Sequence, residues 1–148
     1  MGWVSPTGFV DSGGQWTNEA KAYDGIAEIG NYAKHTPDTT GWTSFLELTH
    51  AALDCNKVRF WIQSNQQAAQ QGIIDLDVYY NDDWHDIYSG DYAAQAWVEK
   101  NLDATYSVTA LRVRFNPTVA SITLPILGEA AFWEVPPAVG RSFGFIMG

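Results

Sequence analysis

Apolar and polar residues alternate with a period of two from residue 44 onward, which predicts a succession of β-strands. In "NKVRFWI", for example, Val58, Phe60 and Ile62 fall on one side and the basic residues on the other. Clusters of turn-forming residues separate the segments. The predicted strands cover residues 44–49, 56–62, 73–80, 84–90, 96–102, 109–115, 121–127 and 129–135.

About eight such segments in one chain predict an all-β fold, an antiparallel β-sandwich or jelly roll. Residues 3–18 are turn-rich, and residues 19–35 could begin as a short helix that glycines interrupt. We expect one β-sandwich domain over residues 1–135. Pro136 and Pro137 then start an extended tail over residues 136–148.

The segments "KVRFW" and "RVRFN" resemble each other and place Arg residues on the side opposite their apolar residues. These arginines could pair across strands with Asp75 and Asp77 of "IIDLDVYY". No further spacing repeats, so we interpret the two segments as strands of one sheet system.

The acidic stretch "VYYNDDWHDIYSG" (residues 78–90) has apolar alternating arms on both sides of "NDD", which indicates a β-hairpin turn. A cation site and a catalytic loop are the alternatives. The stretch lacks the Gly and distant Glu of an EF-hand, and His85 has no second His one helical turn away.

The composition narrows the functional classes. With 148 residues, a net charge of −9 and only eight scattered basic residues, the chain is not expected to bind nucleic acid or an anionic membrane. No apolar stretch is long enough for a membrane span, and the start shows no secretory signal. The single cysteine, Cys55, fits a buried structural thiol.

No catalytic motif stands out. There is no nucleophile elbow, no phosphate-binding Gly loop and no marked pair of carboxylates. We therefore predict that the protein is not an enzyme.

The order of several segments is similar to that of the galactose-binding-like, or discoidin-type, jelly roll. These are "AKAYDG", "FLELT", "CNKVRFWI", "IDLDVYYNDDWHDIYSG", "WVEKNL", "VTALRVRF" and "AAFWEV", within residues 16–135. The resemblance implies a non-catalytic module that binds glycans, lipids or proteins through loops at one end. It requires no cofactor, but it implies a structural Ca²⁺ held by Asp24 and Glu134.

Loop residues that combine aromatic and polar groups are candidates for glycan binding, because sugars need an aromatic platform and fixed polar partners. The candidates are Trp16, Asn18, His35, Asp38 and Trp42. A tryptophan in a short loop can equally close the end of a sandwich.

The tail is apolar where a free terminus should be polar. Its candidate assembly residues are Arg141, Phe143, Phe145, Ile146 and Met147. The tail could cover its own sandwich, or dock on a second copy or another partner.

Two functions follow from these observations. The first is a structural protein that docks onto or builds a larger assembly, as a virion surface or decoration protein or a filament subunit. Its partners would be other protein subunits, and its location a virion or an extracellular assembly. The alternative is a carbohydrate-binding module that recognises glycans through end loops of the sandwich.

Overall fold

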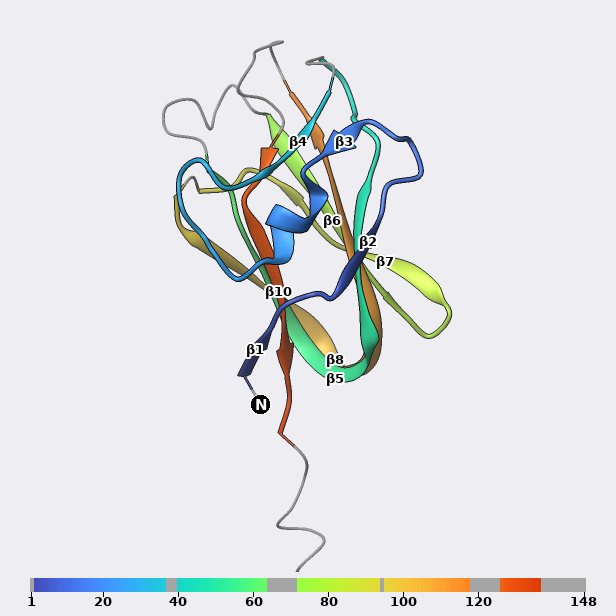
Figure 1. Cartoon of the computed structure of the whole chain (residues 1–148). Helices are drawn as coiled ribbons and strands as arrows, with labels where there is room; N and C mark the ends of the chain where they lie inside the picture. The colour runs from blue at the N-terminus through green and yellow to red at the C-terminus, as the bar shows by residue number, and fades with distance from the viewer. Residues whose placement is uncertain (1, 37–39, 64–71, 94, 118–125, 137–148) are drawn as a thin grey trace, which may run out of the picture.

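The computed structural model describes residues 2–36, 40–63, 72–93, 95–117 and 126–136, and they form β-strands connected by loops (Figure 1). The strands are β1 (Gly2–Val4), β2 (Gly8–Val10), β3 (Trp16–Thr17), β4 (Ala33–His35), β5 (Leu46–Trp61), β6 (Ile73–Tyr80), β7 (Asp83–Gly90), β8 (Trp97–Asn116), β9 (Ile126–Leu127) and β10 (Glu129–Glu134). The expected short helix is a single 3₁₀ turn, η1 (Glu19–Tyr23).

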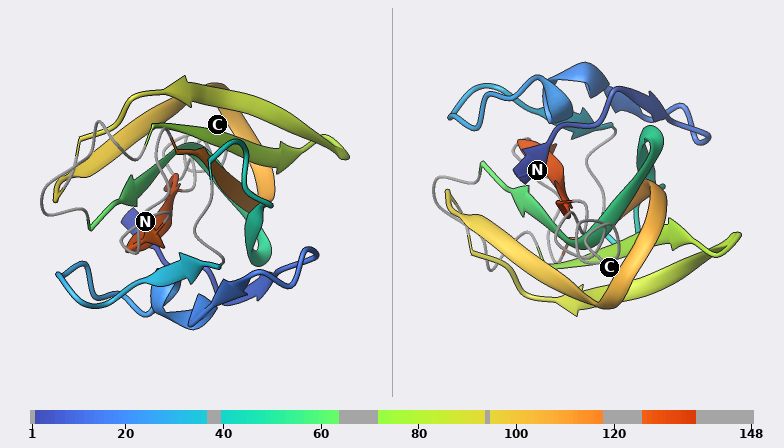
Figure 2. Two further views of the ribbon diagram at one scale, coloured as in Figure 1. Left: turned by 90° about the horizontal axis from the view of Figure 1, so that it is seen from above. Right: turned by 90° about the horizontal axis from the view of Figure 1, so that it is seen from below.

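Two antiparallel sheets form the sandwich. One contains seven strands, in the order β1-β10-β5-β8-β6-β7 with β2 also paired to β5, and the other has the order β3-β4-β9. Figure 2 shows η1 and β4 on one side of the molecule, opposite the layer of β6, β7 and β8. The predicted all-β sandwich is confirmed.

Strands β5 and β8 are much longer than predicted. Each joins two segments that the sequence indicated as separate strands, and the two pair antiparallel with irregular register at Thr49/Leu53 and Cys55/Lys57. Figure 1 shows them bending together at the lower end of the molecule. The prediction of two separate strands over residues 44–62 was therefore wrong. Residues 50–55 contain no Gly or Pro that would end a strand, so the chain bends without leaving the sheet.

The inner faces of the sheets enclose one apolar core. Its largest fully buried side chains include Phe60, Phe115 and Phe132, from β5, β8 and β10. Cys55 is buried among them, and burial raises the pKa of its thiol to about 11. A thiol in this environment stays protonated at neutral pH, in agreement with a structural role.

The hairpin prediction for the acidic stretch is confirmed. β6 and β7 pair from Tyr80↔Asp83, next to the turn, to Ile74↔Gly90 at the open end of the hairpin. The two turn residues, Asn81 and Asp82, have φ of 53° and 61°. Left-handed conformation at both central residues is the type I′ pattern, which matches the twist of the strands.

Within the described part of the chain, no helix has the length and apolar character needed to cross a membrane. The predicted tail residues Arg141, Phe143, Phe145, Ile146 and Met147 lie outside the described residues, as does Asp38. The boundary between domain and tail therefore stays a prediction.

Candidate functional site

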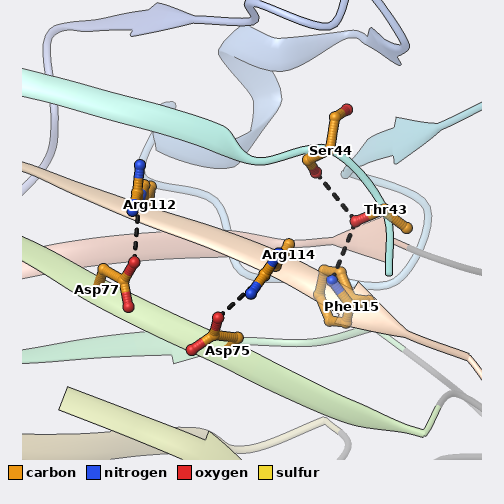
Figure 3. Close-up of polar contacts among 7 residues, drawn as sticks. All are labelled: Thr43, Ser44, Asp75, Asp77, Arg112, Arg114 and Phe115. Carbon is orange, nitrogen blue, oxygen red and sulfur yellow. Dashed lines mark hydrogen bonds and ion pairs between the residues drawn. The ribbon is translucent and has the colours of Figure 1, made fainter. Parts of the chain in front are cut away.

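Two ion pairs cross the outer face of the large sheet. Arg112 Nε lies 2.9 Å from Asp77 Oδ2, and Arg114 Nε lies 2.9 Å from Asp75 Oδ2 (Figure 3). Both pairs join residues that are directly opposite in the β6–β8 register. The cross-strand pairing predicted for these arginines is confirmed, whereas Arg59, the corresponding arginine of "KVRFW", stacks between Trp3 and Trp97.

Aromatic rings enclose both guanidinium groups. The Arg112 guanidinium carbon lies 3.9 Å from the Phe45 ring centre and 4.2 Å from that of Trp84. The Arg114 carbon lies 4.4 Å from Trp42 and 4.6 Å from Phe45. We call these five residues the arginine–aromatic face. Such cation–π contacts hold rings and guanidinium groups in fixed orientations.

A pocket of about 340 Å³ opens on this face. Its lining includes Phe45, Glu47, Arg112 and Arg114, together with residues 10, 12, 13, 43 and 44. Trp42 is 42% exposed and does not line the pocket itself, but its ring lies over Arg114 and it precedes Thr43, and both of these residues line the pocket. An exposed ring beside fixed polar groups is the arrangement that binds the apolar face and the hydroxyls of a sugar.

The loop that carries Trp42 is fixed to β8 through Thr43. Thr43 N donates to Phe115 O at 2.8 Å, and Phe115 N donates to Thr43 Oγ1 at 3.0 Å (Figure 3). The Thr43 hydroxyl in turn donates to Ser44 O at 2.9 Å. These bonds fix the residue that follows Trp42, and Arg114 packs on the Trp42 ring, so the platform is largely ordered before any ligand binds, which lowers the entropic cost of binding.

Three carboxylates, those of Asp75, Asp77 and Asp86, offer oxygens within 4.8 Å of one another. Burial raises the pKa of Asp77 despite its bond to Arg112, and burial together with Asp75 raises that of Asp86. The acidic groups outnumber the two arginines, so the face does not favour an anionic ligand.

The other predicted glycan residues lie elsewhere. Trp16 and His35 are only 3% and 2% exposed and pack edge to face at 5.5 Å. Trp16 Nε1 donates to Ser44 O. Neither side chain can serve as a sugar platform, which corrects the prediction: the tryptophan closes the sandwich. Asn18 is exposed in a left-handed conformation at the start of η1.

Asp24 lies beside Glu129, at the start of β10. Gly25 N donates to Glu129 Oε2 at 2.9 Å, while Glu129 Oε1 is buried without a hydrogen-bond partner among the described residues. Glu134 is five residues further along the strand, roughly 16 Å away. The predicted pairing of Asp24 with Glu134 is therefore wrong.

Glu129 titrates abnormally. Burial raises its pKa to about 7, the Gly25 N–H opposes this change, and the nearby Asp24 carboxylate adds to it. A buried carboxylate oxygen without a partner, next to a second carboxylate, suits a hard cation such as Ca²⁺. Asp24 and Glu129 are the described residues that would hold such an ion.

Comparison with known proteins identifies the fold. No family model matches the sequence, and no curated protein is significantly similar to it. Among solved structures, CBM32-1 from a family 31 glycoside hydrolase of Clostridium perfringens superposes with a TM-score of 0.65 at 10% identity, over 88% of this chain and 96% of that one.

Two further structures are similar. The CBM32 of AlyQ, in complex with 4,5-unsaturated mannuronic acid, gives a TM-score of 0.63 at 13% identity, over 90% of this chain and 98% of that one. The Streptococcus pneumoniae fucose binding module SpX-3 gives 0.63 at 14% identity, over 90% and 100%. The chain therefore has the galactose-binding-like, discoidin-type β-sandwich fold, as the sequence resemblance predicted.

Proposed function

We propose that the protein is a non-catalytic carbohydrate-binding module. The observation that carries the proposal is the arginine–aromatic face, where exposed Trp42 lies beside a pocket with fixed polar groups. The neighbours in fold support it, since they include a fucose binding module and a module in complex with an unsaturated uronic acid. This is the alternative of the two functions that the sequence suggested.

The other function, a virion or filament protein, depends on the tail and has no support from the described residues or from the neighbours in fold. It stays a prediction, together with protein subunits as partners. An extracellular location suits a glycan-binding module. Some similar modules are joined to catalytic domains, such as the CBM32 of AlyQ beside its alginate lyase domain.

Replacing Trp42 with Ala should lower glycan affinity at least tenfold, about 1.4 kcal/mol, because the exposed ring supplies the stacking surface. A glycan array first identifies a ligand, and calorimetric titration then compares the variants. Ile29→Ala is the control, because Ile29 is also apolar and exposed, at 58%, but is not part of the arginine–aromatic face, whereas Trp42 lies over Arg114. Equal glycan affinity of Trp42→Ala and the wild type would show that the Trp42 ring does not stack on the glycan.

We also propose that Ca²⁺, held by Asp24 and Glu129, stabilises the loop that precedes β4. Bound Ca²⁺ would add positive charge beside these two carboxylates, where Arg59 is the nearby cation that already lowers the pKa of Glu129. Its role would be structural, because the two residues lie on different elements from the arginine–aromatic face. A cation that binds only the folded chain must raise the melting temperature.

In EGTA, stability should fall as the pH rises from about 5 to 8. The pKa of Glu129 is raised to about 7 from its usual 4.5, so the folded state binds this proton more tightly than the unfolded chain does. The associated stability is complete below pH 4.5 and is lost as the pH passes 7, with a total of about 3 kcal/mol. Urea unfolding at each pH measures it.

The Glu129→Gln variant is the control for this pH dependence. The fall in stability should flatten in this variant, and added Ca²⁺ should no longer raise the melting temperature at pH 8. If Glu129→Gln shows the same pH profile as the wild type, another group is responsible.

A further inference from the structure

A second pocket is lined by residues of β5 and β8 and by Trp133 of β10. Figure 1 shows β5 and β8 bending together at the end of the molecule where β10 finishes beside β1. The β5–β8 ladder pairs Lys57 with Asn101 and next pairs Cys55 with Tyr106. Between these two pairs, one residue of β5, Asn56, faces four residues of β8. So large a bulge opens the ladder locally and redirects side chains, as bulges near binding sites do.

The opened ladder forms a pocket of about 430 Å³. Its polar lining comes from Asn56, Lys57, Asn101, Asp103 and Thr105, and Trp133 of β10 supplies an aromatic wall. Oδ1 of Asn56 is buried and accepts no hydrogen bond from the described residues. The pocket therefore combines several polar side chains with an aromatic surface, two features that a sugar ring satisfies together.

The charges of the pocket favour a neutral ligand. Its one cation is already engaged, since Lys57 Nζ lies 3.5 Å from Glu99 Oε1 and 4.6 Å from the Trp133 ring centre. Asp103 contributes a negative charge, and its Oδ1 accepts a hydrogen bond from Tyr106 Oη at 2.7 Å. Tyr106 stacks on Tyr80 at 3.9 Å, which fixes the position of the Asp103 carboxylate.

We propose that this pocket is a second saccharide site, which takes one neutral pyranose unit against Trp133 with its hydroxyls directed to Asn56 and Asp103. The inference rests on the proposed function only for the class of ligand. The arginine–aromatic face shares no residue with this pocket. One chain could therefore contact two sugar units of a glycan, or two glycans, and gain avidity.

The test follows the indole N–H signals of the seven tryptophans by NMR. The probes are methyl β-D-glucopyranoside and, as the anionic comparison, methyl β-D-glucuronide, and single Trp→Phe variants assign the signals. We expect the neutral glycoside to shift the Trp133 signal and the glucuronide to bind this pocket more weakly. The signal of buried Trp16 reports that each variant is folded.

The Asn56→Ala variant should weaken the response of Trp133 about tenfold, and Asn116→Ala, at the far end of β8, should leave it unchanged. The Trp133 response should also persist in the Trp42→Ala variant. A loss of glycan binding at the arginine–aromatic face can therefore be distinguished from a loss of binding at this pocket. A Trp133 signal that neither glycoside moves, that moves equally in Asn56→Ala, or that prefers the glucuronide overturns the proposal.

Discussion

Replacing Phe115 with Ala should lower the free energy of unfolding by about 3–5 kcal/mol. The ring is fully buried, and its centre lies 6.3 Å from that of Trp16 and 5.9 Å from that of Tyr92. It therefore contacts both the tryptophan that closes the sandwich and a residue of the β7–β8 connection. Since a domain of this size has only about 5–15 kcal/mol of stability, the variant should be barely folded.

Urea unfolding followed by tryptophan fluorescence measures this loss. Phe9→Ala is the matched control, because Phe9 is also a strand phenylalanine but is 42% exposed, and it should cost less than about 1 kcal/mol. The loss of unfolding free energy in Phe115→Leu should lie between those of Phe115→Ala and Phe9→Ala, since leucine leaves a smaller cavity than alanine. Equal stability of Phe115→Ala and Phe9→Ala would show that this part of the core is not tightly packed.

The strands and the ion pairs of the candidate site could be predicted from the sequence because both depend on a local period of two. Alternation assigns Arg112 and Arg114 to one face of β8, and the same period places Asp75 and Asp77 on one face of β6. Once the strands are neighbours, opposite charges on the same face pair. The hairpin was predictable for a similar reason, since "NDD" suits a turn that the chain makes locally.

Burial of loop residues could not be predicted in this way. Trp16 and Trp42 both lie in polar, Gly-containing stretches, yet one plugs the sandwich and the other is exposed. The difference arises because Trp16 belongs to β3 and pairs with β4, while Trp42 precedes β5. A two-residue strand leaves no periodic pattern. Its position depends on contacts distant in sequence.

The acidic partner of Asp24 was misassigned for another reason. β10 begins and ends with a glutamate, Glu129 and Glu134, and each is followed or preceded by apolar residues. The sequence does not distinguish them, because only the direction of β10 determines which end lies near the Asp24 turn. The Phe45 and Trp84 contributions to the candidate site were missed because strand aromatics usually indicate the core.

Replacing Asp75 with Ala should lower both the stability and the glycan affinity. Asp75 is nearly buried and holds Arg114 Nε at 2.9 Å, so its loss leaves a guanidinium group between two rings without its hydrogen-bond acceptor. Breaking a buried pair costs about 3–5 kcal/mol. We expect about 2 kcal/mol here, because Arg114 is one-third exposed and can turn toward water.

Affinity should fall about tenfold in the same variant, although Asp75 is not among the residues that line the pocket. Arg114 supports the Trp42 ring, so a displaced guanidinium group displaces the platform. Asp86→Ala is the control, because it removes a carboxylate that contacts Asp75 in the same cluster but leaves both arginine–aspartate bonds in place. It should cause no loss of stability, since the Asp86 side chain is exposed overall, and partial burial together with the acidic neighbours raises its pKa and disfavours its charge.

A double-mutant cycle separates the indirect effect from a direct one. If Asp75 acts through Arg114, then Asp75→Ala should cost no further affinity in an Arg114→Ala background, because the group that it positions is already absent. Independent, additive losses in the cycle would instead mean that Asp75 contacts the glycan itself. Titration calorimetry of the four proteins against the glycan found on the array decides between these outcomes, and urea unfolding of the same proteins gives the coupling in stability.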